Sequence, residues 1–298
     1  MITTITASSI TKFLACQRAY YYRYELGLQT VETSDALSFG RAYHAAIEAR
    51  NKGQTAEQAV CAGVTALGNQ NEQLVATLSG LVHGYFSRYE NDLPMATLSE
   101  IRFEHKIGKN GFRAAGVIDG LAELNGGYAL LEYKTTSQAI DTDSDYWVRL
   151  RNNIQINQYV DALETLGYPV REIVYDVTRK PSIRPKLNES LEDYAIRLRD
   201  DCEKRPEFYF ARRQVSVLSD DIERFRTLRR EICYQVAANR KRQKRAATKA
   251  SPWLCCNQQM TCTVCEFKAF CLHGTEATES EIPTGFYVGE RSRTKIKK

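Results

Sequence analysis

The sequence predicts an α/β protein in which a mixed central β-sheet is flanked by helices. Three observations lead to this prediction. A β-hairpin pattern covers residues 115–134, an apolar strand pattern covers residues 172–177, and amphipathic helical patterns stand on both sides of them. Strand patterns enclosed by helical ones are typical of a sheet that is covered by helices. The 298 residues, of which 43% are hydrophobic, are enough to bury one large core or two modest ones.

The periodicity of the apolar residues places the elements in order. Residues 36–92 are expected to be helical, residues 98–135 to form three strands, and residues 152–166 to form the next helix. The strand at residues 172–177 follows a Gly-Tyr-Pro turn. The C-terminal part is expected to contain two helices with a short strand between them, at residues 191–203, 214–218 and 219–245.

The chain is expected to fold as one unit over residues 1–298, because no linker rich in proline, glycine or serine divides it. Within this unit we expect a helical N-terminal part (1–95), a central part that carries the hairpin (96–180) and a helical C-terminal part (181–298). Candidate metal-binding cysteines lie in both the N-terminal and the C-terminal part, so a metal bound by both sets would join these two parts.

The hairpin carries three reactive side chains on one face. Its Asn-Gly dipeptide at residues 125–126 is typical of a two-residue type I′ turn, and such a turn places Asp119 directly opposite Glu132. Because side chains alternate along a strand, Lys134 shares the face of Glu132. A turn one residue later would instead pair Asp119 with Lys134, with all three still on one face.

The acidic pair of the hairpin allows two interpretations. Two carboxylates held opposite one another repel unless a cation lies between them. The first interpretation is a cross-strand ion-pair cluster of Asp119, Glu132 and Lys134 on an exposed sheet face. The second is a divalent-metal site, because carboxylates are the hard ligands that Mg²⁺ and Mn²⁺ prefer and a neighbouring lysine can position a water or hold a phosphate. The residues alone leave both open.

Cysteines form a second group of candidate ligands. Of nine in the chain, the last five are close in sequence: Cys255, Cys256, Cys262, Cys265 and Cys271. No signal peptide or membrane-spanning apolar run is found, so we expect an intracellular chain, in which clustered cysteines indicate a metal rather than disulfides. A fourth ligand beside Cys262, Cys265 and Cys271 could be local, giving a zinc site, or could be the distant Cys16.

These motifs together resemble the PD-(D/E)XK nuclease superfamily, and within it the RecB-type iron–sulfur exonuclease branch that also serves CRISPR adaptation. Asp119, followed after twelve residues by Glu132-Tyr133-Lys134, is similar to the D…E-x-K signature. Four further segments resemble, in family order, the N-terminal helix, the G…H…E helix, the Q-x-x-x-Y helix and the terminal cysteine cluster: residues 8–24, 40–48, 155–159 and 262–271.

The resemblance implies a restriction-endonuclease-like core that works as a metal-dependent DNA exonuclease. It implies that one or two Mg²⁺ or Mn²⁺ ions are held by His44, Asp119, Glu132 and the backbone carbonyl near Tyr133. Lys134 would orient the attacking water. Gln155 and Tyr159, which share one helical face, would face the phosphodiester or the lysine.

The resemblance also implies a [4Fe–4S] cluster that staples the two ends of the chain together. Its ligands would be Cys16, Cys262, Cys265 and Cys271, and Cys256 could replace Cys262. Relatives of this kind occur in phage recombination modules and in CRISPR adaptation. We therefore expect a cytoplasmic protein of a prokaryote or a phage-infected cell, working without a membrane and with a recombination or CRISPR-adaptation partner protein.

The charge distribution is compatible with DNA as the partner, as single strands or duplex ends. The formal net charge is +5, and basic runs lie at residues 240–245 and 291–298. Such runs are often solvated, but they also bind the phosphate backbone. Two alternatives use the same fold without this chemistry: a catalytically silent DNA-binding or assembly protein, and a nucleic-acid adaptor held together by zinc.

Overall fold

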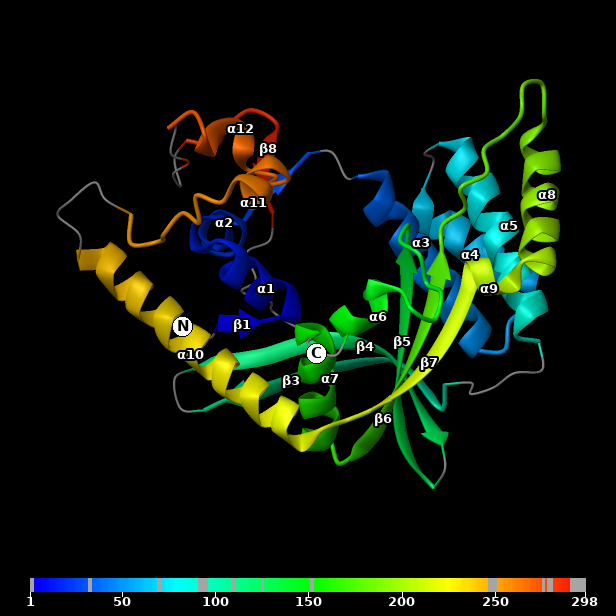
Figure 1. Ribbon diagram of the computed structural model, residues 1–298. Coiled ribbons are helices and arrows are strands. Elements are labelled where there is room, and N and C mark those ends of the chain that lie inside the picture. Colours follow the sequence, from blue (N-terminus) through cyan, green and yellow to red (C-terminus); the bar gives the residue numbers. More distant parts are fainter. Residues whose placement is uncertain are drawn as a thin grey trace.

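The structure is a computed structural model that describes residues 3–31, 34–68, 71–90, 96–108, 111–124, 126–150, 153–245, 251–274, 277 and 281–289. A mixed sheet lies at its centre, with helices gathered on either side (Figure 1). This confirms the predicted α/β class. No helix in these residues is long and apolar enough to cross a membrane. The basic segment predicted at residues 291–298 lies outside the described residues.

The sheet has six strands, and most of them match the sequence patterns. Its order is β1 (Thr3–Ile5), β4 (Phe112–Leu124), β5 (Gly127–Thr136), β6 (Val170–Arg179) and β7 (Phe210–Ser216), with β3 (Leu98–Ile107) also paired to β4. The pairs β1–β4 and β5–β6 are parallel and the others are antiparallel. The three strands predicted over residues 98–135 are confirmed. The strand predicted at residues 214–218 begins earlier, because Phe210 is buried in the core.

Helices cover the sheet in two groups (Figure 1). The first is α3 (Asp35–Asn51), α4 (Ala56–Leu67), α5 (Glu72–Arg88), α8 (Leu191–Lys204) and the short α9 (Pro206–Tyr209). The second is α1 (Ala7–Ala15), α6 (Asp145–Leu150), α7 (Ile154–Thr165) and α10 (Ser219–Arg245). The short α2 (Gln17–Tyr20) and the π-helix η1 (Tyr21–Glu25) follow α1 and pack against the C-terminal segment around Phe267. The helical segment predicted over residues 36–92 is thus three helices, and α4 begins at a capping box on Thr55.

A small cysteine-rich region completes the described fold. It contains α11 (Gln259–Thr263), α12 (Lys268–Cys271) and a two-stranded ribbon of β2 (Leu28–Thr30) with β8 (Phe286–Val288). Because β2 follows the first helices and β8 lies near the end of the chain, this ribbon brings the N- and C-terminal segments together. The sequence patterns did not predict either of these short strands.

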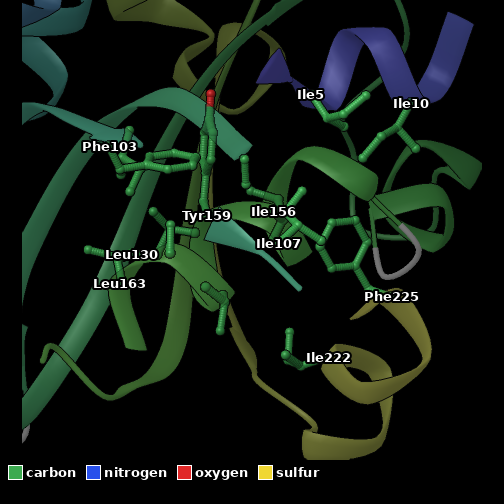
Figure 2. Close-up of a cluster of buried hydrophobic side chains, with 14 of the residues drawn as sticks. Ile5, Ile10, Phe103, Ile107, Leu130, Ile156, Tyr159, Leu163, Ile222 and Phe225 are labelled. Atoms are coloured by element: carbon green, nitrogen blue, oxygen red, sulfur yellow. The ribbon is translucent and has the colours of Figure 1, made fainter. Parts of the chain in front are cut away.

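The apolar side chains form a separate core on each face of the sheet. The first core packs α1, α7 and α10 against one face, and Figure 2 shows ten of its members: Ile5, Ile10, Phe103, Ile107, Leu130, Ile156, Tyr159, Leu163, Ile222 and Phe225. The second core packs α3, α5 and α8 against the other face. The adjacent β5 residues Leu130 and Leu131 belong to different cores, as alternation along a strand requires.

Candidate active site

The candidate site lies where one edge of β4 is left without a strand partner. On that edge β1 pairs up to Ala114, and β5 pairs from Gly120 onward. The intervening residues 115–119 face neither strand. Gln158 of α7 occupies part of this gap, where its Nε2 donates to Ala115 O at 3.1 Å and Ile5 O at 3.4 Å. Asp119 lies at the other end of the gap, beside β5.

The register of the hairpin is the one that a turn at residues 125–126 requires. Leu124 pairs with Gly127, and the pairing continues to Gly120 with Leu131, one step before Asp119. At that step the Oδ2 atom of Asp119 accepts a hydrogen bond of 3.0 Å from the backbone N–H of Tyr133. At the point where β4 and β5 separate, this side-chain hydrogen bond therefore replaces a backbone one. It fixes the Asp119 carboxylate beside Glu132.

Glu132 is a fully buried carboxylate with an unpaired oxygen. Its side chain has 0% exposure, and its Oε1 atom forms an ion pair with Lys134 Nζ. The Oε2 atom has no hydrogen-bond partner in the described part of the chain. Burial, which is opposed by the Lys134 charge and assisted by the Asp119 charge, raises the pKa of Glu132 to about 7. A buried carboxylate oxygen without a partner is costly unless a cation or a proton satisfies it.

His44 reaches the acidic pair from the other layer of the protein. It lies on α3, and its Nδ1 atom is 3.5 Å from Asp119 Oδ1. Burial opposes a charge on the ring, but the hydrogen bond and charge of Asp119 outweigh it and raise the pKa of His44. The His44 side chain is 38% exposed and lines an open groove of about 460 Å³ together with Gly40, Arg41 and Glu48. The groove leaves room for a ligand beside His44.

α7 supplies the polar residues that hold the lysine. Gln155 Oε1 accepts a hydrogen bond of 2.9 Å from Lys134 Nζ, and Gln155 Nε2 donates to Tyr159 OH at 3.0 Å. α7 begins at Asn153, whose side chain accepts from the backbone N–H of Gln155. The structure therefore orders Glu132, Lys134, Gln155 and Tyr159 in one chain of contacts. Burial, and then the Glu132 charge, raise the pKa of Tyr159, which keeps its hydroxyl neutral.

Two further tyrosines near Glu132 were missed by sequence reasoning. Tyr175 pairs with Glu132 across β5 and β6, and its hydroxyl donates to Leu150 O at 3.1 Å. Tyr146 lies on α6, a helix that the sequence patterns did not predict. The sequence offered one signal for α6, which is the adjacent Tyr-Trp pair at residues 146–147. This pair comes shortly after the end of β5.

The residues fit a divalent cation without forming a complete coordination shell. The described residues contain no group of three or more His, Cys, Asp or Glu side chains arranged to hold a metal ion. The pair Asp119 and Glu132 nevertheless offers hard oxygen ligands, one of them unpaired, and His44 lies beside Asp119. A Mg²⁺ ion commonly binds through one or two carboxylates and completes its shell with water and substrate phosphates.

The cysteine-rich region forms a second candidate site. Cys16 lines one small cavity together with the last five cysteines of the chain: Cys255, Cys256, Cys262, Cys265 and Cys271. All of them are free thiols. The Sγ atoms of Cys256 and Cys262 are 3.8 Å apart. The structure therefore brings Cys16 and all the C-terminal candidates together. The ligand set that includes the distant Cys16 and the local set of C-terminal cysteines both lie in this cavity.

Cys16 is a thiol with a lowered pKa. It stands at the N-terminus of α2, where the chain is extended between two helices. Burial opposes its charge, but hydrogen bonds from the backbone N–H groups of Ala19, Cys256 and Arg18 outweigh it and lower the pKa of Cys16. The thiolate is the form of cysteine that binds metals. Thiolates are the ligands that soft metals and iron–sulfur clusters prefer.

One comparison with known proteins identifies a family. A family model described as the PD-(D/E)XK nuclease superfamily matches residues 4–272. Among solved structures, the chain is similar to that of SSO0001, with 11% identity, a TM-score of 0.41, and 92% of this chain and 88% of that chain covered. It is also similar to a protein from Eubacterium rectale described as a "Putative exonuclease", with 12% identity, a TM-score of 0.45, and 93% and 90% covered. No curated protein matches the sequence.

Proposed function

The chain belongs to the PD-(D/E)XK nuclease superfamily, and from this premise we propose that it is a metal-dependent deoxyribonuclease that degrades DNA from ends or along single strands. The observation that carries the proposal is the buried Glu132 carboxylate, whose Oε2 atom has no partner in the described residues and which lies beside Asp119 and Lys134. A cluster that served stability alone would be expected to satisfy this oxygen. A bound cation would supply the partner that the Oε2 atom of Glu132 lacks.

We assign the metal to Asp119, Glu132, His44 and the backbone carbonyl of Tyr133. When bound, a Mg²⁺ or Mn²⁺ ion would neutralise charge on the scissile phosphate and make a water more acidic. Asp119 is held for this role by the N–H of Tyr133, which leaves its Oδ1 atom directed toward His44.

Lys134 would orient the attacking water and stabilise charge on the phosphate. Its Nζ atom is held between Glu132 and Gln155, so the ammonium group is positioned before substrate arrives. Positioned charges of this kind cost no reorganisation during the reaction. Tyr159 supports the arrangement one step away, because its hydroxyl accepts from Gln155 and fixes the orientation of that amide.

We further propose that the cysteine cavity holds a [4Fe–4S] cluster that joins the two ends of the chain. The proposed ligands are Cys16, Cys262, Cys265 and Cys271. The presence of Cys255 and Cys256 in the same cavity supports zinc as the second candidate, because a local ligand set is then within reach. Anaerobically purified protein should contain about four irons per chain, and Cys16→Ser should lose them. One zinc per chain that is insensitive to Cys16→Ser would establish the zinc alternative.

The nuclease proposal is tested with end-labelled single-stranded and duplex DNA. The wild type should degrade DNA with Mg²⁺ or Mn²⁺ and be inactive in EDTA, whereas circular single strands should resist an exonuclease. Asp119→Asn and Glu132→Gln should abolish degradation, because each removes a charged ligand. The matched control is Glu123→Gln, which changes an exposed carboxylate on the same strand as Asp119 and should keep full activity.

Two results would contradict the proposal. Undiminished degradation by Glu132→Gln would remove the carboxylate pair from the mechanism. A protein that binds DNA but cuts none of these substrates with either metal would instead be the DNA-binding or assembly protein of the same fold. A role in recombination, repair or CRISPR adaptation, with the partner protein that this implies, stays a prediction from the sequence resemblance.

A further inference from the structure

The face of the sheet that carries Glu132 continues onto two neighbouring strands. Glu132 lies opposite Tyr175 in the pairing of β5 with β6, and Tyr175 lies opposite Arg213 in the pairing of β6 with β7. Directly paired residues project to the same side of a sheet. Arg213 therefore stands in the same row as Glu132, about 10 Å away across two strand spacings. The proposed mechanism gives this arginine no role.

Arg213 is held against the face of a tryptophan. Its guanidinium carbon lies 4.2 Å from the ring centroid of Trp147, and its Nη2 atom donates to Thr142 O at 2.7 Å. The indole is fixed in turn, since its Nε1 atom donates to Asp141 O at 2.9 Å and to Ile140 O at 3.1 Å. Among the residues that the structure describes, no carboxylate pairs with Arg213. Most of its N–H groups are therefore available to an outside anion.

Tyr146 extends this surface. Its ring packs edge-on against Trp147, with the centroids 5.3 Å apart. Both rings pack against the core that contains Tyr175, the cross-strand neighbour of Glu132. No described residue accepts a hydrogen bond from the Tyr146 hydroxyl. We call Tyr146, Trp147 and Arg213 the aromatic–arginine shelf.

We propose that the aromatic–arginine shelf binds single-stranded DNA next to the scissile phosphate. Arg213 would bind a neighbouring phosphate of the strand, and the rings of Trp147 and Tyr146 would stack on a base. A guanidinium group matches a phosphate in a planar, bidentate geometry. Aromatic side chains stack on bases with little regard to sequence. This inference rests on the proposed nuclease function and names the residues that would hold its substrate.

The shelf requires a base whose face is free. A single strand or a frayed end offers such a base, and an intact duplex does not. The loop that leads to Trp147 is acidic, with carboxylates at Asp141, Asp143 and Asp145. Arg213 lies against this loop, where its charge offsets the carboxylates. Binding of single strands at the shelf is therefore expected to use Arg213 as well as the rings.

Tryptophan fluorescence reports on the shelf directly. The chain has two tryptophans, and Trp253 is fully buried and stacked against Tyr20 and Tyr21. Titration of the full-length protein with oligothymidylate in EDTA should quench the emission, because a thymine stacks on Trp147. Trp147→Phe should still bind the oligonucleotide, more weakly, with the emission of Trp253 unchanged. A wild type that binds the oligonucleotide without any change in emission overturns the proposal.

Variants separate the phosphate contact from the stacking contact. Arg213→Gln should weaken oligothymidylate binding about tenfold and lower the log–log salt slope by about 0.7, the value of one phosphate contact on a single strand. Tyr146→Leu should weaken binding about tenfold with the slope unchanged. The matched control is Arg230→Gln, an exposed arginine of α10 whose Nη2 atom donates to Thr227 Oγ1 at 3.4 Å. Equal effects of Arg213→Gln and Arg230→Gln overturn the proposal.

The proposal can fail separately from the nuclease function. Should Arg213→Gln not fold, as judged by its circular dichroism, the Tyr146→Leu affinity and the wild-type quench decide the outcome. A protein that degrades DNA in a Glu132-dependent manner but shows no quench keeps its nuclease function and loses the shelf. A protein that shows the quench and the Arg213 dependence but cuts no DNA keeps the shelf and loses the nuclease function.

Discussion

Replacement of Asp161 by asparagine should loosen the helix that carries Gln155 and Tyr159. Asp161 lies on α7 and is 4% exposed. Its carboxylate binds Arg226 at 2.6 Å and Arg229 at 2.7 Å, both on α10, and lies 3.3 Å from Nε2 of His105 on β3. This one side chain therefore ties α7 to a helix and to a strand of the sheet.

The size of the effect follows from the burial of the partners. The Arg229 side chain is 6% exposed, and its Nε and Nη1 atoms have no hydrogen-bond partner in the described residues. Without Asp161 its charge would stay buried and unpaired, which costs about 3–5 kcal/mol. The matched control is Glu164→Gln on the same helix. Glu164 also pairs with Arg226 but is 38% exposed, so its loss should cost at most about 1 kcal/mol.

Urea unfolding followed by circular dichroism measures the difference. At neutral pH the midpoint of Asp161→Asn should fall by about 1–2 M relative to the wild type, given a slope of about 2–3 kcal/mol per M. The midpoint of Glu164→Gln should barely move. Equal midpoints for the two variants would refute the reasoning, because they would show that the buried arginine does not need its carboxylate partner.

The same side chain predicts a pH dependence. Burial opposes a charge on Asp161, but the hydrogen bond to His105 and the two arginines outweigh it and lower the pKa of Asp161. A group whose pKa is lower in the folded state contributes its stability above the unfolded value of about 3.9 and loses it as the pH falls through the folded value. The gap between wild type and Asp161→Asn should therefore narrow below about pH 4.

Three further predictions concern the proposed site, the DNA surface and the helical layer. Lys134→Met should lower kcat by about 100-fold or more without weakening DNA binding, as single-turnover and binding assays can show. Neutralising the exposed end of α10, at Arg242, Lys244 and Arg245, should lower duplex affinity and reduce the salt slope by about one unit per lost phosphate contact. Arg240 is left out of this variant because it pairs with Glu25. A methyl group at Gly84 would meet Cys202 Cβ at 2.5 Å, so Gly84→Ala should cost about 1–3 kcal/mol and lower the Tm of a thermal melt.

The hairpin shows how much of the candidate site could be predicted from sequence. The Asn-Gly turn and the alternation of side chains are properties of consecutive residues, so they specify a register before any tertiary contact is known. The observed pairing of Leu124 with Gly127 confirms that register. The spacing of Gln155 and Tyr159 is equally local, and the hydrogen bond between them confirms that they share a helical face. The roles given to these residues stay predictions.

The fine structure of the N-terminal and loop segments could not be predicted in this way. The helical segment expected from residue 8 onward is interrupted at Cys16, whose backbone is extended, and continues as a short helix and a π-helix. β1 is three residues long and α6 is six, too short to show a period of their own. Such elements form because neighbouring elements supply their hydrogen bonds and burial.

The sequence by itself determined the α/β class, the register of the hairpin and the shared face of Gln155 and Tyr159, because turn geometry and apolar periodicity act between near neighbours in the chain. Only the tertiary structure decided which distant segments meet. His44 contacts Asp119 because α3 packs against one face of the sheet, where it contacts β5 and β3. Cys16 lies with five later cysteines because the two ends of the chain form one apolar cluster. Burial of apolar surface drives these encounters, and it is not directional, so it leaves no short pattern in the sequence that identifies the partner.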